Sequence, residues 1–434
     1  MSPDVPPKHG VPQMLTVAAA KAAIGSVEPS VPAVEIVPLR RAVGRVLAED
    51  VRAAVDVPPF RRAAMDGYAV RREDVASASH NFPARLRVDG SLTAGARAPG
   101  GASRDDGLPV APLRPGCARR IATGAMLPPG AEGVVPVEST RPAGEGWIEV
   151  IASIERRSNV SERGEEFAAG EVAVCAGVRL GPEAVGAIAS VGVGAVSVFA
   201  KPKVAVVTTG NELKRPGEAL YPGEIYNSGY YALCGLIERD GGEVLGDGAP
   251  VPDAPREIRR AIESAAGMGA DLVITTGGVS VGEKDCVPEA IEALGGRLLF
   301  WRVRMRPGKA CAFAVLPGGP CVFALSGNPA AALVAYEVLA RPFLLRLGGE
   351  AAVERQVAQA ELSDGFDKPS PQERYLRAQV VASGGRLVAS LAAGQQAGHF
   401  RSWMETNALV VVPAGAGPLP AGAKVDAMLL GALA

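Results

Sequence analysis

The sequence predicts a multidomain protein that combines an α/β region with β-rich regions. Its 434 residues are too many for one compact core. Between residues 201 and 348, apolar strand-like runs alternate with helical stretches, as in a parallel sheet covered by helices. In residues 53–165 and 349–434 the apolar runs are shorter and lie between glycines and prolines, which favours β-structure.

The composition argues against several classes of protein. The net charge of −1, from 45 basic and 46 acidic residues, is not typical of a nucleic-acid-binding protein. No apolar run reaches about 18 residues and no basic-then-apolar leader opens the chain, so we expect a cytoplasmic protein without a membrane span. Six scattered cysteines without a C-x-x-C pair argue against structural zinc and a disulfide framework. Three histidines leave little scope for a histidine base or a histidine-rich metal site.

Residues 14–52 and 166–200 are predicted to form one discontinuous helical domain. "MLTVAAAKAAIGSV" and "VPLRRAVGRVLAEDV" have apolar residues at helical spacing, and "AVGAIASVGVGAV" returns to that pattern further along the chain. Between them, residues 53–165 contain the strand-like runs "LRVDGSL", "CARRIATG", "GVVPVES" and "WIEVIAS". A β-rich domain is therefore expected as an insertion in the helical one.

Residues 201–348 are predicted to form a three-layer α/β domain. "KVAVVTTG" and "ADLVITTGG" are near-continuous apolar strands, as parallel sheets require. "NSGYYALCGLIERDGG", with Asn227 or Ser228 as its cap, and "DAPREIRRAIESAAG" are predicted helices. Residues 349–434, with the runs "RLVASL", "ALVVVP" and "KVDAML", are expected to form a separate β-barrel-like domain.

A candidate anion site follows the predicted strand Cys321–Leu325. The segment "CVFALSGNPAAALVAY" continues through a tight Ser326–Gly327 turn into a helix that Asn328 caps and Pro329 begins. The N–H groups of a first helical turn and the positive end of the helix suit an anion. An ordinary strand–turn–helix connection is the alternative.

Four basic side chains are clustered in "LFWRVRMRPGKACAF". Arg302, Arg304 and Arg306 would lie on one face of a strand because side chains alternate, and Lys309 follows a Pro-Gly turn. Together they are suited to hold phosphate or another oxyanion. The alternative is an edge strand whose charges protect it from pairing.

Acidic residues follow predicted strands at what should be one edge of the sheet. Glu212, Asp253 and the pair Glu283 and Asp285 each come soon after a strand. Because ligands of open parallel sheets bind at the carboxyl ends of the strands, the three loops should converge, and their oxygens suit Mg²⁺ with phosphate. In isolation, each acid is better explained as a helix cap or a solvated charge.

Two glycine-containing turns complete the candidate site. In "GGVSVGEKDC", Gly277 and Gly278 allow backbone N–H groups to approach a ligand, and Ser280 follows them. In the β-rich region, "VPPFRRAAMDGYAV" surrounds the turn Asp66–Gly67 with apolar residues. That loop is either structural or a surface that meets another subunit.

Taken together and in this order, these stretches resemble the molybdenum insertases of molybdenum cofactor biosynthesis, the family of bacterial MoeA and the E domain of gephyrin-type proteins. The resemblance covers nearly the whole chain after the first dozen residues. The matching stretches are "VPLRRAVGRVLAEDV", "AMDGYAV", "ATGAMLPPGAEGVVPVE", "TTGNEL", "GGVSVGEKD", "RPGKACAF", "SGNPAAAL" and "SWMETNAL". Of these, "AMDGYA" and "GGVSVGEKD" are highly specific.

The resemblance implies an elongated homodimer of four-domain subunits, with the active site between the molybdopterin-binding α/β domain of one subunit and the β-rich domain of the other. The family uses molybdate and Mg²⁺ to convert adenylylated molybdopterin into molybdenum cofactor, with release of AMP. The molybdopterin adenylyltransferase and recipient molybdoenzymes would be its protein partners. The implied catalytic residues are Asp66, Thr123, Glu212, Asp285 and Lys309, and the implied metal ligands are Asp253 and Asp285. The implied substrate-binding residues are Gly277, Gly278, Ser280, Arg306, Ser326, Gly327, Asn328 and Pro329.

The chain departs from the family pattern where anions would bind. Ser161 stands in place of an arginine, and Ser326 in place of a proline. The other departures are Gly229, Arg306, Ala331 and Ala397. Two alternatives to an insertase therefore stay open. One is a non-catalytic paralogue that binds molybdopterin as a carrier, sensor or maturation scaffold; the other is an adenylyltransferase, against which the extra domains and "AMDGYA" argue.

Overall fold

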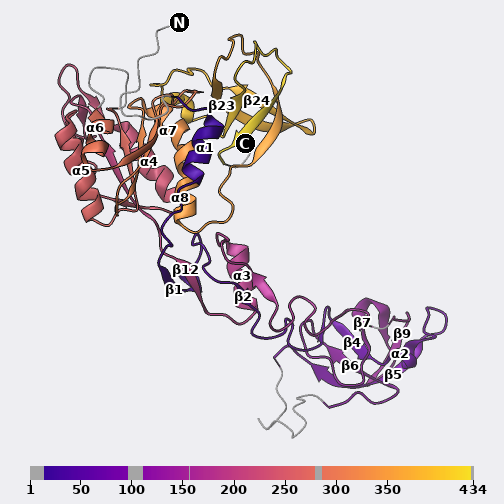
Figure 1. Ribbon diagram of the computed structural model, residues 1–434. Helices are drawn as coiled ribbons and strands as arrows, with labels where there is room; N and C mark the ends of the chain where they lie inside the picture. The colour runs from indigo at the N-terminus through magenta and orange to yellow at the C-terminus, as the bar shows by residue number, and fades with distance from the viewer. Residues whose placement is uncertain (1–13, 96–110, 156, 279–285, 432–434) are drawn as a thin grey trace.

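The computed structural model describes residues 14–95, 111–155, 157–278 and 286–431, and the molecule is elongated (Figure 1). A large body at one end contains the α/β region and the C-terminal barrel. A β-rich module, which we call the tip (the described part of residues 62–161), forms the other end. A middle region, in which residues 34–52 pair with residues 172–199, connects the two. The predicted combination of α/β and β-rich regions is confirmed, while the domain boundaries stay a prediction.

The α/β region is built on a six-stranded sheet. In spatial order its strands are β16 (Glu243–Leu245), β13 (Lys203–Thr208), β17 (Leu272–Thr276), β21 (Cys321–Leu325), β20 (Ala312–Val315) and β18 (Arg297–Trp301). The first four are parallel, and β20 is antiparallel to both of its neighbours. Two short strands, β14 (Leu213–Lys214) and β15 (Ile225–Tyr226), pair beside it.

Helices cover both faces of this sheet. They are α4 (Ser228–Arg239), α5 (Pro255–Gly267), α6 (Cys286–Ala293), α7 (Pro329–Ala335) and α8 (Arg341–Leu347), with the π-helix η3 (Tyr336–Ala340) between the last two. In β17, Leu272 and Ile274 pack with α4, α7 and α8, whereas Val273 packs with α5 and α6. The predicted three-layer arrangement is therefore confirmed. Among the helices of the described ranges, none has the length and apolar character needed to cross a bilayer.

The N-terminal helix α1 (Val17–Gly25), which the sequence predicts, packs on the α/β body. Its residues Val17, Ala20 and Ile24 are buried in the same core cluster as Ile274. The backbone just before it forms a parallel bridge between Leu15 and Val303. The chain then leaves the body for the middle region.

The second predicted helix, over "VPLRRAVGRVLAEDV", is wrong. These residues contain the end of β1 (Val34–Pro38), one 3₁₀ turn, η1 (Leu39–Arg41), and the start of β2 (Val51–Arg52). Pro38 favours extended backbone and Gly44 takes a φ of +80°, so pairing with strands far along the chain overrides the helical spacing. The partner strands are β12 (Ala195–Phe199) for β1 and β11 (Val172–Val174) for β2. Of "AVGAIASVGVGAV", the first part is helical, in α3 (Pro182–Ser190).

The tip is a second six-stranded sheet, which confirms the four strands predicted there. Its order is β7 (Gly133–Pro136), β4 (Gly67–Val70), β6 (Cys117–Ile121), β5 (Ala84–Leu92), β9 (Trp147–Val150) and β8 (Thr140–Pro142). The short helix α2 (Arg72–Val75) and the 3₁₀ turn η2 (Val137–Ser139) accompany it. At its base β3 (Arg62–Ala63) pairs with β10 (Val160–Ser161), so the chain enters and leaves the tip through neighbouring strands.

The C-terminal region is a closed five-stranded barrel, as predicted. Its strands are β22 (Val357–Leu362), β23 (Glu373–Ser383), β24 (Arg386–Leu391), β25 (Ala408–Val412) and β26 (Lys424–Leu429), with the 3₁₀ turn η4 (Arg401–Trp403) before β25. The order β23-β24-β22-β26-β25 is closed by a further pairing of β25 with β23. One short strand from the α/β region, β19 (Met305–Arg306), adds to β23 in parallel.

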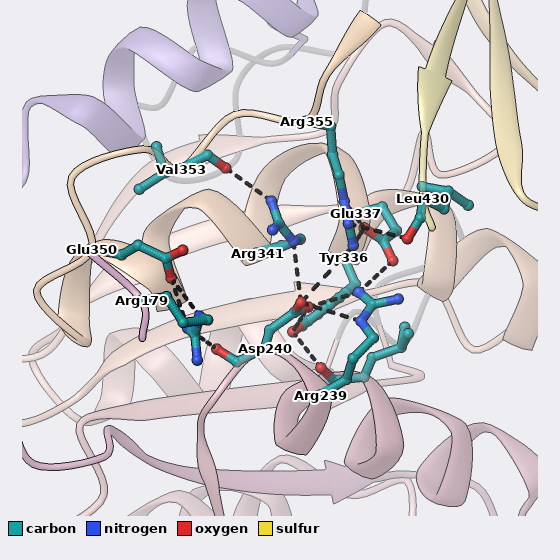
Figure 2. Close-up of polar contacts among 11 residues, drawn as sticks. Arg179, Arg239, Asp240, Tyr336, Glu337, Arg341, Glu350, Val353, Arg355 and Leu430 are labelled. Carbon is teal, nitrogen blue, oxygen red and sulfur yellow. Dashed lines mark hydrogen bonds and ion pairs between the residues drawn. The ribbon is translucent and has the colours of Figure 1, made fainter. Parts of the chain in front are cut away.

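A partly buried ionic network, which we call the elbow network, joins the body to the middle region (Figure 2). Its members are Arg179, Arg239, Asp240, Tyr336, Glu337, Arg341, Glu350 and Arg355. The Glu337 carboxylate, in a residue that is 1% exposed, accepts hydrogen bonds from Arg239 at 2.8 Å and Arg355 at 2.9 Å. Arg179 of the middle region donates to Glu350 at 2.7 Å and to the Asp240 carbonyl oxygen at 2.9 Å.

Asp240 holds the centre of this network as an ionised group. It accepts hydrogen bonds from Arg239 at 2.8 Å, the Tyr336 hydroxyl at 2.9 Å and Arg341 at 3.3 Å. Burial opposes ionisation, but the hydrogen bond and charge of Arg239, with the charge of Arg341, hold the pKa of Asp240 below its usual value. Burial and then the Asp240 charge raise the pKa of Tyr336 well above its usual value, so the phenol stays a donor.

Candidate active site

The loops after four parallel strands meet at the carboxyl edge of the α/β sheet. The Gly210 N–H, after β13, donates to the Val251 carbonyl, after β16, at 3.1 Å. The Gly277 N–H, after β17, donates to the Leu325 carbonyl at the end of β21, at 3.3 Å. Each loop is thereby tied to a neighbour, as expected for the ligand edge of an open parallel sheet.

Glycines allow these loops to approach one another. Gly277 and Gly278 have φ values of +92° and +64°, in the left-handed region that side chains disfavour. A Cβ at Gly277 would lie 2.5 Å from the Thr209 carbonyl oxygen, and one at Gly327 would lie 3.3 Å from the Gly277 Cα. The close packing of the loop backbones is therefore enough to require glycine at these positions. That these glycines contact a ligand stays a prediction.

The start of α7 lies where the α/β region meets the C-terminal region. β21 ends at Leu325 and α7 begins at Pro329 with Asn328 as its N-cap, which confirms the predicted strand–turn–helix. A Cβ at Gly229 of α4 would lie 3.8 Å from Pro329, and one at Gly398 of the C-terminal region would lie 3.8 Å from the Asn328 Oδ1. The Asn328 N–H has the Ser326 hydroxyl as an acceptor at 3.3 Å, so Ser326 orders the turn itself.

The predicted row of arginines on one strand is wrong. β18 ends at Trp301, and Arg302 has a φ of +77° and stacks over the Trp301 ring at 4.8 Å. This left-handed residue ends the strand, and Arg306 belongs instead to the separate strand β19. Lys309 is exposed on the turn that follows, while Gly308 packs against α7, where a Cβ would lie 3.5 Å from the Ala331 carbonyl oxygen. Arg306 and Lys309 are thus carried on a segment that contacts α7.

Asp253 is the described acid best placed for a cation. Its N–H donates to the Asn211 side chain at 3.4 Å, which brings the loop of Glu212 beside it. Its Oδ1 is buried and, like the Thr209 hydroxyl, has no hydrogen-bond partner among the described residues. Asp285, Glu283 and Ser280 lie outside the described residues.

The oxygen ligands at this edge are compatible with Mg²⁺, but they do not surround a metal ion on their own. In the described ranges, no three His, Cys, Asp or Glu side chains are grouped so that they could hold a metal. Mg²⁺ is commonly bound through one or two carboxylates together with substrate phosphates and water. The Oδ1 of Asp253, to which no described residue donates a hydrogen bond, suits that kind of site.

Asp66 and Thr123 form a second constellation, in the tip. The Thr123 N–H and hydroxyl each donate to the Asp66 Oδ1 at 2.7 Å. These two hydrogen bonds, the backbone one first, lower the pKa of Asp66. The strands next to them, β4 and β6, lie at the opposite end of the molecule from α4, α6 and α7 (Figure 1). Within one chain, the two constellations are therefore separate.

The sequence reasoning missed Arg377, a fully buried arginine of β23. Its Nη2 donates to the carbonyl oxygens of Gly394 at 3.0 Å and Gln396 at 3.1 Å, which fixes the loop that reaches Asn328. Its Nε and Nη1 have no partner within the described part of the chain, and burial lowers its pKa. The available signal in "RYLRAQVV" was Arg377 itself, a charged residue between the apolar residues Leu376 and Ala378.

The positions that depart from the family pattern fall in three places. Ser161 lies in β10, at the base of the tip. Gly229, Arg306, Ser326 and Ala331 lie around α7, and Ala397 precedes the residue beside Asn328.

Comparison with known proteins agrees with this arrangement along the whole chain. Family models match successive parts: MoeA N-terminal region (domain I and II) over residues 15–192, probable molybdopterin binding domain over residues 205–346, and MoeA C-terminal region (domain IV) over residues 359–430. A molybdopterin molybdenumtransferase of Bacillus subtilis is 33% identical over 399 residues, which is 91% of this chain and 90% of that protein. The chain belongs to the MoeA family.

Other MoeA relatives show the same extent of similarity. A molybdopterin molybdenumtransferase of a Nostoc species is 33% identical over 88% of this chain and 85% of its own length. The crystal structure of a molybdopterin biosynthesis MoeA protein from Pyrococcus horikoshii is 32% identical, covers 97% of this chain and 100% of its own, and has a TM-score of 0.76. The resemblance stated from the sequence motifs is thus confirmed.

Proposed function

We propose that this protein transfers molybdenum from molybdate to adenylylated molybdopterin and releases AMP. The observation that supports this most directly is the meeting of four loops at one sheet edge, where Asp253, the start of α7 and the Lys309 turn are brought together. The family membership supports the same reaction, because relatives carry the name molybdopterin molybdenumtransferase.

Mg²⁺ would be held by Asp253, with Asp285 as the second carboxylate that the sequence motif suggests. When bound, it would supply positive charge next to the phosphate groups of the substrate. The buried Oδ1 of Asp253, which has no hydrogen-bond partner among the described residues, supports this choice, because a lone buried carboxylate oxygen is costly without a cation or donor.

The chain's own cations would bind the anionic groups. Breaking a phosphoanhydride leaves extra negative charge on the departing phosphate, and Lys309 and Arg306 would neutralise it. At the start of α7, Pro329 has no N–H, and the N–H groups of Ala331 and Ala332 already donate to the Asn328 carbonyl. The Ala330 N–H and the positive end of the helix would therefore face an oxyanion. The sulfur ligands of molybdenum come from the dithiolene of the substrate, so no cysteine of the protein is required.

A homodimer would complete the site. Asp66 is kept ionised and oriented by two hydrogen bonds from Thr123, yet it lies in the tip, away from the α/β edge. The tip of a second subunit would bring this carboxylate to the bound substrate. We also propose that the reaction takes place in the cytoplasm, that a molybdopterin adenylyltransferase supplies the substrate and that molybdoenzymes receive the product.

The test is to incubate the purified protein with adenylylated molybdopterin, Mg²⁺ and molybdate, and to measure AMP release and activation of an apo-molybdoenzyme. We expect both, and we expect Asp253→Ala to stop AMP release without changing the thermal unfolding of the protein. Tight pterin binding without cofactor formation at any molybdate concentration would instead assign a carrier, sensor or scaffold. AMP release that is unchanged in Asp253→Ala would overturn the metal assignment.

A further inference from the structure

We propose that Arg374, on β23 of the C-terminal barrel, forms with Arg306 a two-guanidinium subsite for a tetrahedral oxyanion. The inference rests on the proposed function, whose reactants offer two such groups, the phosphate of the nucleotide and molybdate. Arg374 would then be a residue through which the barrel contacts the reactants directly.

The strand register places the two arginines side by side. β19 and β23 are parallel, with Met305 opposite Glu373 and Arg306 opposite Arg374. Residues in direct register point to the same face of a sheet, so the two cationic side chains share one face. Like charges directly opposite each other destabilise a strand pair. An anion bound between them would remove that cost.

The contacts of Arg374 leave its charge unneutralised. Its Nε donates to the Ser370 hydroxyl at 3.0 Å, its Nη2 donates to the Pro369 carbonyl at 3.2 Å, and its guanidinium lies 5.4 Å from the centre of the Phe366 ring. Within the described ranges, none of these partners is a carboxylate. Burial, and then the charge of Arg306, lower the pKa of Arg374. These contacts fix the guanidinium in place and, among the described residues, leave Nη1 available to a ligand.

The chain connects this pair with the Lys309 turn of the candidate active site. Arg306 begins the turn that carries Lys309, and Gly308 between them packs on α7, where a Cβ would lie 3.3 Å from the Ala335 side chain. A guanidinium presents two parallel N–H donors that match the oxygens of phosphate, whereas an ammonium acts as a point charge. The fixed guanidinium of Arg374, together with Arg306 and Lys309, would thus orient an oxyanion as well as attract it.

The experiment compares the affinity of the full-length protein for inorganic phosphate, AMP and molybdate, each measured by calorimetry and by the rise in melting temperature that the anion causes. The variants are Arg374→Gln, Arg306→Gln and the double variant. Arg386→Gln is the matched control, because it removes one arginine from the same barrel that is paired with Glu361 at 2.6 Å.

We expect Arg374→Gln and Arg306→Gln each to weaken oxyanion binding about ten- to a hundredfold, the usual effect of losing a charge-assisted hydrogen bond. The double variant should lose less than the product of the two single losses, because both arginines would hold one anion. Without anion, Arg374→Gln should melt close to wild type, because it relieves repulsion from Arg306 but loses the hydrogen bonds to Ser370 and Pro369. An effect on phosphate and AMP alone assigns the nucleotide phosphate, and an effect on molybdate alone assigns molybdate.

Equal affinity of Arg374→Gln and Arg386→Gln for all three anions would overturn the proposal. So would a lower melting temperature of Arg374→Gln combined with an unchanged anion-induced rise, because that result describes a purely structural arginine. If the wild type binds oxyanions through both arginines but releases no AMP from adenylylated molybdopterin, the subsite stands and the proposed reaction fails. If turnover is normal and Arg374→Gln changes no affinity, the reaction stands and the subsite fails.

Discussion

Replacing the carboxylate of Glu337 by an amide should strongly destabilise the body of the molecule. Glu337→Gln keeps the volume of the side chain but removes the charge between Arg239 and Arg355, which it contacts at 2.8 and 2.9 Å. The Glu337 side chain is 0% exposed and that of Arg355 is 14% exposed, so the arginine charge would stay buried with only the more distant Asp240, at 3.9 Å, as a counter-ion.

The expected loss can be worked from these contacts. Removing one partner of a buried ion pair usually costs about 3–5 kcal/mol. The Arg239 side chain is 38% exposed and can turn to water, which favours the lower end, about 3 kcal/mol. For a unit of about 150–250 residues, that corresponds to a fall in melting temperature of about 6–12 °C.

Scanning calorimetry of the full-length protein measures this change in the transition of the body. The matched control is Glu361→Gln, which breaks the Arg386–Glu361 pair at 2.6 Å, where the side chains are 63% and 32% exposed. An exposed pair of this kind contributes about 0–1 kcal/mol, so the control should shift the transition little. Equal small shifts in the two variants would show that a buried carboxylate in the elbow network contributes no more to stability than an exposed one.

Three further outcomes follow from the site. Subunits carrying Asp66→Ala, when exchanged with subunits carrying Asp253→Ala, should regain part of the AMP-releasing activity that each homodimer lacks; proven exchange without activity would exclude a site shared between subunits. Thr123→Val should raise the pKa of Asp66 towards its ordinary value in an NMR titration, because the hydroxyl donor is lost. The carboxylate would then protonate at a higher pH as the solution is acidified, and an unchanged titration would show that the Thr123 hydroxyl does not lower this pKa. Ser161→Arg combined with Ser326→Pro should lower the molybdate concentration that gives half-maximal cofactor formation. The arginine would regain a charge-assisted hydrogen bond of about 1.5–3 kcal/mol, and the proline would stiffen the turn by about 0.4–1 kcal/mol. No change would mean that neither position contacts the oxyanion.

The sequence predicts the structure correctly where local residue preferences and tertiary packing favour the same conformation. The runs that became β13 and β17 are apolar on both faces because helices cover both sides of the sheet. Asn328 and Pro329 start α7 because each suits its position at a helix N-terminus. The meeting of the loops after these strands follows from parallel topology, so Glu212 and Asp253 could be placed at one edge in advance.

The predictions from sequence were wrong where contacts between residues far apart in the chain determine the conformation. The stretch after Pro38 has helical spacing, but pairing of β1 with β12 leaves room for one 3₁₀ turn only. Arg302 was expected in a strand, although stacking on Trp301 accompanies a left-handed backbone that ends the strand. Glu337 and Arg377 are both buried, and the packing of elements that are distant in the sequence decides this.

The way the chain passes through the base of the tip has an evolutionary consequence. β2 pairs with β11, and β3 pairs with β10, so the outgoing and returning strands run together as a two-stranded stalk. The described residues beyond the stalk form a single excursion of the chain, and their strands pair with no strand of the body. A recombination event at the stalk can therefore exchange one tip for another as a cassette, with the α/β sheet and the barrel keeping their connections. One such event can thus replace the residues around Asp66 while the residues around Asp253 stay unchanged.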